Sequence, residues 1–289
     1  DCESLNADAS YLFAEGIMTL PASALPVETG PAFLGVERSA TGRVWRDRLD
    51  PRGAAKALAI AQRYQVPEML SRIIAGRGID IDAVEVFLDP TIRKLLPDPL
   101  TVTDMEAAAK RIADAATRGE TVAVFGDYDV DGATSAALLT WHLRHCGLDP
   151  LIHIPDRIFE GYGPNVEAVR GLANKGATLL VTVDCGTTSM EPLAEAKRLG
   201  MDVVVIDHHQ CGDELPIVDA LVNPNRLDDL SGLGHLAAVG LVFVTLVAVN
   251  RELRARNFWS DVRPEPNLLD ALHHVALGTV ADVAVLTGL

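Results

Sequence analysis

Beyond Gly119 the sequence alternates short apolar runs with amphipathic stretches, and this rhythm restricts the fold more than any other feature. The apolar runs are TVAVF, LIHI, TLLVTV, VVVI and ALV, and the stretches between them include ATSAALLTWHLRHC, NVEAVRGLANKG and EPLAEAKRLG. Apolar strands that alternate with helices predict a parallel sheet with helices on both faces. We therefore expect an α/β fold over residues 119–289, in which HLAAVGLVFVTLVAVNRELRAR and NLLDALHHVAL form further helices.

The sequence before Gly119 shows helical periodicity. The stretch PRGAAKALAIAQRY begins with a proline, which suits the first turn of a helix, and PEMLSRIIAGRG repeats this arrangement. Glu106 follows Thr103 by three residues, a spacing that predicts a capping box at the start of the last helix in this part. We therefore expect a helical N-terminal segment over residues 41–118. Residues 1–40 lack periodicity, and we expect a poorly ordered arm there.

The composition disfavours several classes of protein. No apolar run is long enough to span a bilayer and no signal segment opens the chain, so we expect a cytoplasmic protein without a membrane partner. The formal net charge of −15 argues by itself against binding to nucleic acid, because phosphate contacts need basic side chains. The cysteines are scattered without a C-x-x-C pair, which favours reduced thiols over disulfides or a zinc site.

Acidic residues follow three of the expected strands. TVAVF runs into GDYDVDG, TLLVTV runs into Asp184, and VVVI runs into Asp207, His208 and His209. The carboxyl ends of parallel strands meet along one edge of the sheet, so these side chains should lie together. Closely packed carboxylates repel each other and take up protons unless a cation neutralises them. The pattern therefore predicts a metal centre at this edge.

The residue types narrow the identity of the metal. Asp127, Asp129 and Asp131 match the first half of a calcium-binding EF-hand loop, but the twelfth position is Leu138 instead of Glu, and a strand precedes the loop. A solvated acidic turn that caps the next helix explains one such stretch but not three. Mixed Asp and His ligands suit Mn²⁺ and similar ions better than Ca²⁺, and the lack of Cys ligands disfavours structural zinc. This many carboxylates suit two ions, which together promote phosphoryl hydrolysis.

Four motifs in order, GDYDVDG, VTVDCGTTS, VVVIDHHQ and ALGTVADVAVL, resemble those of the DHH phosphoesterase superfamily. Within it, FLGVERSATGRVWRDRL, FLDPTIRKLLPDP, RIFEGYGPN and SGLGHLAAVGLVF are similar to the RecJ-type exonucleases, and this resemblance runs from about Phe33 to the C-terminus. It implies a DHH phosphoesterase domain over residues 119–289 that hydrolyses single-stranded DNA from 5′ to 3′ in DNA repair and recombination, with two ions of Mn²⁺ or Mg²⁺. It also implies a single-strand-binding protein and a recombination helicase as partners.

The resemblance assigns roles to individual residues. Asp184 is implied to bridge the two ions, His209 to face the scissile phosphate, and Asp207 to orient the histidine pair. The implied metal ligands are Asp127, Asp129, Asp131, Asp184, His208 and Asp282. RecJ-type enzymes continue with a second, smaller domain and an oligonucleotide-binding fold, so we expect the sequence to be truncated at its C-terminus.

Three further residues are candidates for substrate binding. Arg157 and Tyr162 in RIFEGYGPN are expected to contact a phosphate or a base, with a tight glycine-rich turn as the alternative. His235 precedes a glycine-rich helix start, where backbone N–H groups favour an anion, and the alternative is a plain helix-entry residue. We expect His142 on the surface of the helix after the acidic loop. No Cys–His motif of recognised spacing accompanies Cys185, so we do not expect a cysteine nucleophile.

Two other functions share these features. Another DHH enzyme, such as a manganese pyrophosphatase or a small-oligonucleotide phosphodiesterase, would have the same metal ligands, but the helical N-terminal segment and RIFEGYGPN favour the RecJ type. A non-catalytic DHH-like replication scaffold is the second alternative. Such scaffolds lose ligands, whereas every ligand position is filled in this sequence.

Overall fold

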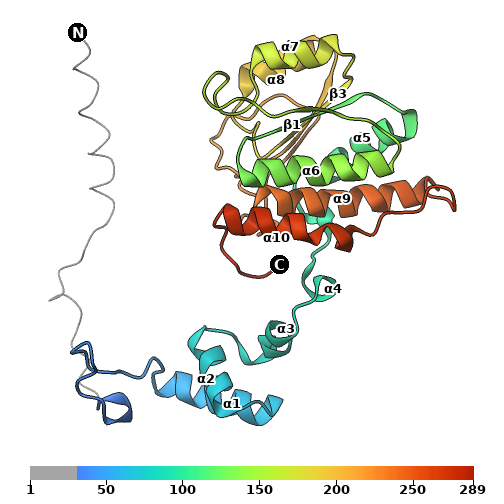
Figure 1. Cartoon of the computed structure of the whole chain (residues 1–289). Coiled ribbons are helices and arrows are strands. Elements are labelled where there is room, and N and C mark those ends of the chain that lie inside the picture. Colours follow the sequence, from blue (N-terminus) through green and yellow to red (C-terminus); the bar gives the residue numbers. More distant parts are fainter. Residues whose placement is uncertain (1–30) are drawn as a thin grey trace, which may run out of the picture. The chain divides into compact units, whose positions relative to one another are not determined.

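A computed structural model describes residues 31–289 (Figure 1). The described residues divide into two compact units, with the boundary between Pro90 and Thr91. Residues 1–30 of the arm expected over residues 1–40 lie outside the described residues.

The first unit is helical. Asp50 caps α1 by accepting a hydrogen bond from the Gly53 N–H at 2.6 Å, and Pro51 occupies the first helical position. Ile60 of α1 and Ile74 of α2 are fully buried against each other's helices in a small core. The elements are η1 (Phe33–Gly35), α1 (Pro51–Tyr64), α2 (Glu68–Gly76), η2 (Ile81–Ala83) and α3 (Val84–Leu88).

The second unit begins with α4 (Ile92–Leu95), η3 (Pro99–Thr101) and α5 (Met105–Arg118). Helix α5 packs on α9 (Ala238–Ala255) and on β5 (Ala220–Val222), so it lies in the same unit as the sheet. The expected capping box at its start is wrong. The N-cap is Asp104, which has a left-handed φ of 61° and no capping side-chain bond. The Thr103 N–H donates instead to Oδ2 of Asp229 at 2.8 Å, so a contact distant in sequence replaces the local cap.

Five parallel strands form the sheet, which confirms the expected α/β fold. Their order is β2-β1-β3-β4-β5. Strand β2 lies on one side of β1, and β3, β4 and β5 follow on the other side. The order of the strands therefore reverses beside β1, so the carboxyl ends of β1 and β3 lie at a topological switch point. The strands are β1 (Val122–Gly126), β2 (Leu151–His153), β3 (Leu179–Val183), β4 (Asp202–Ile206) and β5 (Ala220–Val222).

Helices cover both faces of the sheet, as Figure 1 shows. One face packs on α7 (Val166–Asn174) and α8 (Met190–Arg198), and the other on α5, α6 (Val130–His145) and α9. Outside α6 and α9 lies α10 (Leu272–Ala281), which follows the 3₁₀ turn η4 (Leu268–Ala271). No helix in the described part of the chain is both long and apolar enough to cross a membrane.

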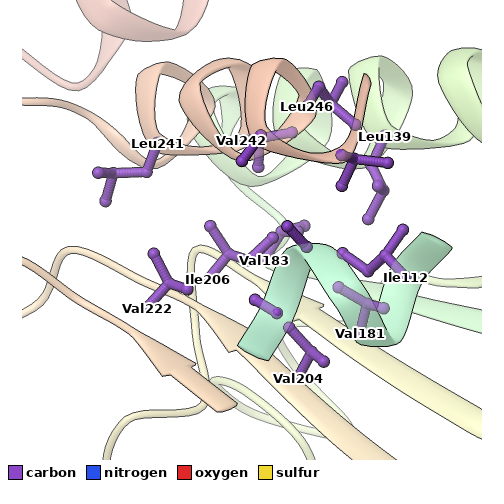
Figure 2. Close-up of a cluster of buried hydrophobic side chains, with 14 of the residues drawn as sticks. Ile112, Leu139, Val181, Val183, Val204, Ile206, Val222, Leu241, Val242 and Leu246 are labelled. Atoms are coloured by element: carbon purple, nitrogen blue, oxygen red, sulfur yellow. The ribbon is translucent and has the colours of Figure 1, made fainter. Parts of the chain in front are cut away.

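The larger core fills the space between the sheet and α9. Leu241, Val242 and Leu246 of α9 belong to one cluster with Val183 and Ile206 of the sheet (Figure 2), and all five side chains are fully buried. Burial of such an aliphatic side chain stabilises a protein by about 1.5–3 kcal/mol. This packing fixes the level at which the strands end and therefore the position of the residues that follow them.

His142 is not on the surface, so that expectation is wrong. The side chain is fully buried, and Nε2 lies 2.7 Å from Oδ1 of Asn250 on α9. Burial lowers the pKa of His142 to about 4. Because α9 and α10 cover the side of α6 that faces away from the sheet, a polar residue there becomes interior.

Candidate metal centre

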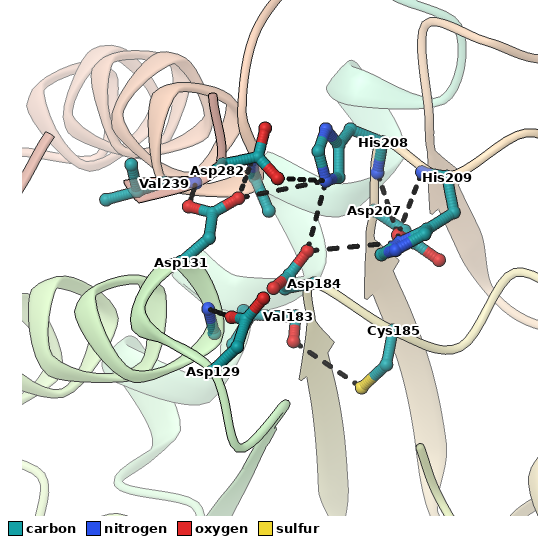
Figure 3. Close-up of polar contacts among 12 residues, drawn as sticks. Asp129, Asp131, Val183, Asp184, Cys185, Asp207, His208, His209, Val239 and Asp282 are labelled. Carbon is teal, nitrogen blue, oxygen red and sulfur yellow. Dashed lines mark hydrogen bonds and ion pairs between the residues drawn. The ribbon is translucent and has the colours of Figure 1, made fainter. Parts of the chain in front are cut away.

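Acidic residues and histidines from four parts of the chain meet at the carboxyl edge of the sheet (Figure 3). They follow β1, β3 and β4, and one follows α10. Their ligand atoms form three groups within which all atoms lie less than 4.8 Å apart. The groups are Asp127 with Asp129 and Asp184, Asp131 with His208 and Asp282, and Asp184 with His208 and His209.

The loop after β1 presents its three aspartates through the start of α6. Asp129 is the N-cap and accepts a hydrogen bond from the Gly132 N–H at 2.9 Å. A Cβ at Gly132 would lie 2.5 Å from the carbonyl oxygen of Asp127, so only glycine fits. The tight turn places Asp127 and Asp129 on the side of Asp184, while Asp131 points toward α9.

Asp131 also joins α6 to α9. Its Oδ2 accepts from the Ala238 N–H at 2.6 Å, and its Oδ1 accepts from the Val239 N–H at 2.9 Å. These are the first N–H groups of α9, where a carboxylate is favoured by the helix dipole. Burial raises the pKa of Asp131, and the two hydrogen bonds oppose that rise. The sequence predicted that N–H groups at this helix start would favour an external anion. Instead, the Ala238 and Val239 N–H groups donate to the carboxylate of Asp131.

Asp184 lies at the centre of the cluster. It belongs to two of the three groups, its backbone has a left-handed φ of 61°, and its side chain is almost fully buried. Such a conformation is uncommon outside glycine and is often found at functional sites. Burial raises the pKa of Asp184 to about 7, and the neighbouring Asp131 and Asp129 contribute to the rise.

His208 turns a ring nitrogen toward this acidic cluster. Its Nδ1 lies 3.2 Å from the Leu236 carbonyl oxygen, which can only accept, so Nδ1 carries the hydrogen. Nε2 then faces Asp184 Oδ1 at 3.2 Å, Asp131 Oδ2 at 3.8 Å and Asp282 Oδ1 at 3.9 Å. Burial alone would lower the pKa of His208, but these carboxylates outweigh it and raise that pKa to about 9. The arrangement requires positive charge at Nε2, either a proton or a metal ion.

Asp207 orients the histidine pair. Its Oδ1 accepts from the His208 N–H at 2.8 Å and from Nδ1 of His209 at 2.8 Å, and its Oδ2 accepts from the Thr187 N–H at 3.0 Å. Burial opposes ionisation of Asp207, but the hydrogen bonds from His209 and Thr187 outweigh it and lower the pKa to about 2. The bond to Asp207 in turn raises the pKa of His209. Asp207 is in none of the three groups found among the described residues.

Two asparagines beside the histidines were missed by the sequence analysis. Nδ2 of Asn223 donates to the His209 carbonyl at 2.9 Å and to Thr187 Oγ1 at 2.9 Å. Nδ2 of Asn225 donates to the His208 carbonyl at 2.5 Å. Both follow β5 in the stretch VNPN, so the rule that polar strand ends share one edge would have found them.

Asp282 reaches the cluster from the C-terminal end of α10, where its N–H donates to the Gly278 carbonyl at 2.8 Å. Gly278 is the point at which α10 meets α6 and α9. A Cβ there would lie 2.5 Å from Thr134 Oγ1, 2.7 Å from Val239 Cγ1 and 2.9 Å from Asp131 Oδ1. The missing side chain of Gly278 therefore allows α10 to approach closely enough to present Asp282.

The three expected substrate-binding residues have different surroundings. The Tyr162 hydroxyl donates to the Asp184 carbonyl at 3.2 Å, and its ring is half exposed beside His209. The Arg157 guanidinium lies over the ring of Tyr128, 5.2 Å from its centre. His235 instead lines an apolar cavity of about 420 Å³ formed by α9, α10 and the last residues of the chain.

Cys185 is fully buried, and its Sγ lies 3.4 Å from the Val183 carbonyl oxygen (Figure 3). Burial raises the pKa of its thiol well above the usual value. A buried thiol of this kind is a poor nucleophile, because the thiolate is the reactive form.

The side chains of the cluster fit divalent metal ions. Oδ1 of Asp127 is buried without a hydrogen-bond partner in the described part of the chain, and Oδ1 of Asp184 is buried facing Nε2 of His208 at 3.2 Å. These buried carboxylate oxygens, together with the ring nitrogen of His208, leave negative charge and lone pairs directed at a shared space. Oxygen ligands with one imidazole suit Mn²⁺ and Mg²⁺, and the carboxylates are sufficient for two ions.

Comparisons with known proteins point in the same direction. Residues 121–279 match the family model described as the DHH family, N-terminal domain. The chain is 39% identical over 224 residues to the single-stranded-DNA-specific exonuclease RecJ of Salmonella typhimurium, an alignment that covers 76% of this chain and 38% of that protein. A structure of RecJ from Thermus thermophilus in complex with Mn²⁺ is 30% identical with a TM-score of 0.65, covering 83% of this chain and 32% of that one. A structure of exonuclease RecJ bound to manganese is 34% identical with a TM-score of 0.57, covering 67% of this chain and 46% of that one.

Proposed function

Because this chain belongs to the DHH family, we propose that it carries the catalytic centre of a metal-dependent exonuclease that acts on single-stranded DNA. The observation that carries the proposal is the meeting of five aspartates and His208 at the switch point of the sheet. The names of the RecJ relatives support the choice of substrate. The chain spans 38% of the length of the Salmonella relative, so the proposal concerns the centre within a larger enzyme.

The residues of these three groups would hold two divalent ions, Mn²⁺ or Mg²⁺. Asp127 and Asp129 would bind one ion, Asp131, His208 and Asp282 the other, and Asp184 would be shared between them, since it contacts both sets. Two divalent metal ions held in this way lower the pKa of bound water and stabilise the leaving oxygen in phosphodiester hydrolysis.

His209 and Tyr162 would act on the substrate side of the centre. Asp207 holds Nδ1 of His209 and favours its protonated form, so His209 would present an Nε2–H donor to a non-bridging oxygen of the scissile phosphate. Charge that develops on that oxygen is stabilised by a donor whose orientation is already fixed. The half-exposed ring of Tyr162 beside His209 would border the nucleotide that is cleaved. Arg157 would contact a neighbouring phosphate.

The wider setting follows from the resemblance to RecJ-type enzymes. It comprises 5′→3′ cleavage in DNA repair and recombination in the cytoplasm, in contact with a single-strand-binding protein and a recombination helicase. These parts of the proposal need the whole protein for their test, whereas the hydrolytic centre can be tested in the present chain.

The test uses oligonucleotides labelled at either end, with Mn²⁺ or with a chelator. Hydrolysis of single strands with Mn²⁺, and no hydrolysis with the chelator, is the expected result. Asp184→Asn should abolish cleavage, while the matched variant Asp149→Asn should retain it, because Asp149 is an exposed acid remote in sequence from every ligand. Full activity of Asp184→Asn would contradict the proposal. Hydrolysis of pyrophosphate without cleavage of oligonucleotides would identify the chain as a pyrophosphatase instead.

A further inference from the structure

Within the first unit, residues 31–78 carry an excess of basic side chains. Residues 31–78 contain nine Lys and Arg but four Asp and Glu, whereas residues 79–289 contain 16 and 31. Four of the nine, Arg46, Arg48, Arg72 and Arg77, line one cavity of about 390 Å³ between α2 and the segment that precedes α1. The metal centre uses none of them. We refer to this feature as the arginine cavity.

Asp47 also lines the arginine cavity, but its carboxylate pairs with Arg72 and so does not repel a bound anion. Oδ2 of Asp47 lies 2.6 Å from Nη2 of Arg72, and Oδ1 of Asp47 accepts from the Leu49 N–H at 3.0 Å. The Arg72 guanidinium is thereby held over the ring of Phe33, 5.7 Å from its centre. An arginine fixed by an ion pair and by an aromatic ring is preorganised to present its remaining N–H groups.

Arg48 and Arg77 supply charge that no acid neutralises. Neither side chain forms an ion pair with a carboxylate within residues 31–289. Arg48 lies along the end of α2, where a Cβ on Gly76 would be 3.6 Å from its Cδ. Arg77 follows directly after Gly76 at the C-terminus of α2. Together with Arg72 they surround a concave surface with guanidinium groups, which bind phosphate oxygens through paired N–H donors.

Phe33 and Met69 are among the side chains that line the same cavity, and Met69 is 70% exposed. Trp45, which is 49% exposed, lies outside the lining but is bonded to Phe33 through the backbone. The Phe33 N–H donates to the Trp45 carbonyl at 3.0 Å, and the Trp45 N–H donates to the Val36 carbonyl at 3.0 Å, so both aromatic residues are held in one closed loop. Rings next to arginines provide stacking surfaces for unpaired bases, which a duplex does not offer.

We propose that the arginine cavity binds single-stranded DNA, with backbone phosphates on Arg48, Arg72 and Arg77 and an unpaired base on Phe33 or Trp45. The choice of DNA rests on the proposed function, whereas the preference for a single strand rests on the arginines and rings of the cavity itself. The site would supply the phosphate contacts that the acidic metal centre lacks.

The experiment measures binding of a fluorescent single-stranded oligonucleotide by fluorescence anisotropy, with the full 289-residue chain and a chelator present, so that neither metal nor cleavage contributes. The variant Arg48→Ala/Arg77→Ala removes two charges from the cavity. The control Arg52→Ala/Arg63→Ala removes two charges from α1, outside the cavity, and circular dichroism checks that both variants are folded. Titrations at several salt concentrations, and competition by duplex DNA and by inorganic phosphate, complete the series.

The cavity variant should bind at least about tenfold more weakly, and the slope of log affinity against log salt should fall by about 1.4, since each phosphate contact on a single strand contributes about 0.7. The control should bind nearly as well as the unsubstituted chain, and duplex should compete poorly. Equal losses in both double variants would show that only net charge matters and would overturn the proposal, as would unchanged binding by a folded cavity variant. Hydrolysis of bis(p-nitrophenyl) phosphate with Mn²⁺ by the unsubstituted chain is measured separately. Failure of that reaction would count against the proposed function without changing the binding result.

Discussion

Gly278→Ala should weaken metal binding although it changes no ligand. In an exposed helix, replacing glycine by alanine stabilises a protein by about 1 kcal/mol. In α10 the new Cβ would lie 2.5 Å from Thr134 Oγ1, and that hydroxyl is itself held by the Val130 carbonyl at 2.7 Å. Overpacking of this kind costs about 1–3 kcal/mol, so we expect net destabilisation of up to about 2 kcal/mol.

The structure indicates which element would move. The outer side of α10 is exposed, with Leu277 at 58% and Val280 at 68%, whereas α6 is enclosed by the sheet, α9 and α10. Helix α10 should therefore retreat by roughly 1 Å, the shift that restores an ordinary contact of at least 3.4 Å. Asp282 would retreat with it from Nε2 of His208, 3.9 Å away at present. A displacement of this size disables a metal ligand, and we expect the affinity for Mn²⁺ to fall about 10- to 100-fold.

Calorimetric titration with Mn²⁺ and thermal unfolding with a chelator measure the two effects. The matched control is Gly171→Ala in α7, where a Cβ would have no neighbour within 4 Å. The control should unfold at a slightly higher temperature and bind Mn²⁺ normally. If Gly278→Ala behaved in the same way as Gly171→Ala, the close approach of α10 would not be what positions Asp282.

Three further predictions follow from the same geometry. Asp207→Asn should lower the rate of oligonucleotide cleavage about 10- to 100-fold while the fold is retained, because it weakens the orientation of His209; cleavage kinetics and circular dichroism test this. In the metal-free chain His208 has a pKa of about 9 and Asp184 of about 7, so protons compete with metal and the Mn²⁺ affinity should fall as the pH decreases from 9 through 7, as titration calorimetry would show. His142 has a pKa of about 4 in the folded state and about 6.5 when unfolded, so its neutral form stabilises the fold above pH 6.5 and that contribution is lost as the pH falls through 4. Between pH 7 and pH 4 the free energy of unfolding should therefore decrease by about 3 kcal/mol more than in His142→Gln, measured by urea denaturation.

The sequence was sufficient for features that depend on short stretches. The inner strands β1, β3 and β4 each contain a continuous apolar run, because inner strands of a covered parallel sheet are buried on both faces, and Leu179–Val183 is an example with all five residues buried. The edge strand β2 is partly exposed. The residues after such strands share an edge, which is how Asp184 and His208 could be predicted to lie near each other before any coordinates. The order of the strands could not be predicted in this way, since β3 and β4 carry similar apolar runs.

Features that depend on two distant elements could not be predicted. The Thr103 capping box follows a local rule, but the distant Asp229 takes the Thr103 N–H. His142 was placed on the surface because it is polar, whereas α9 covers it and supplies Asn250 as its partner. Local sequence rules give no reason for a glycine at Gly278, and only the positions of α6 and α9 explain why no side chain fits. In each case a deciding contact joins residues more than 100 positions apart in sequence.

The distribution of charge answers the objection that a chain with a net charge of −15 could not act on a polyanion, as proposed. The objection from net charge assumes that the charge is spread evenly, and in this chain it is not. Six aspartates converge at the sheet edge and its surroundings, where bound divalent ions would offset their negative charge. The surface that meets a phosphate there would therefore be less acidic than the sequence suggests. Affinity for the rest of the strand needs basic groups, and the sequence concentrates them in residues 31–78. Catalysis and strand binding therefore place opposite demands on charge, and different segments of the chain can meet them: acidic residues at the sheet edge and basic residues within 31–78.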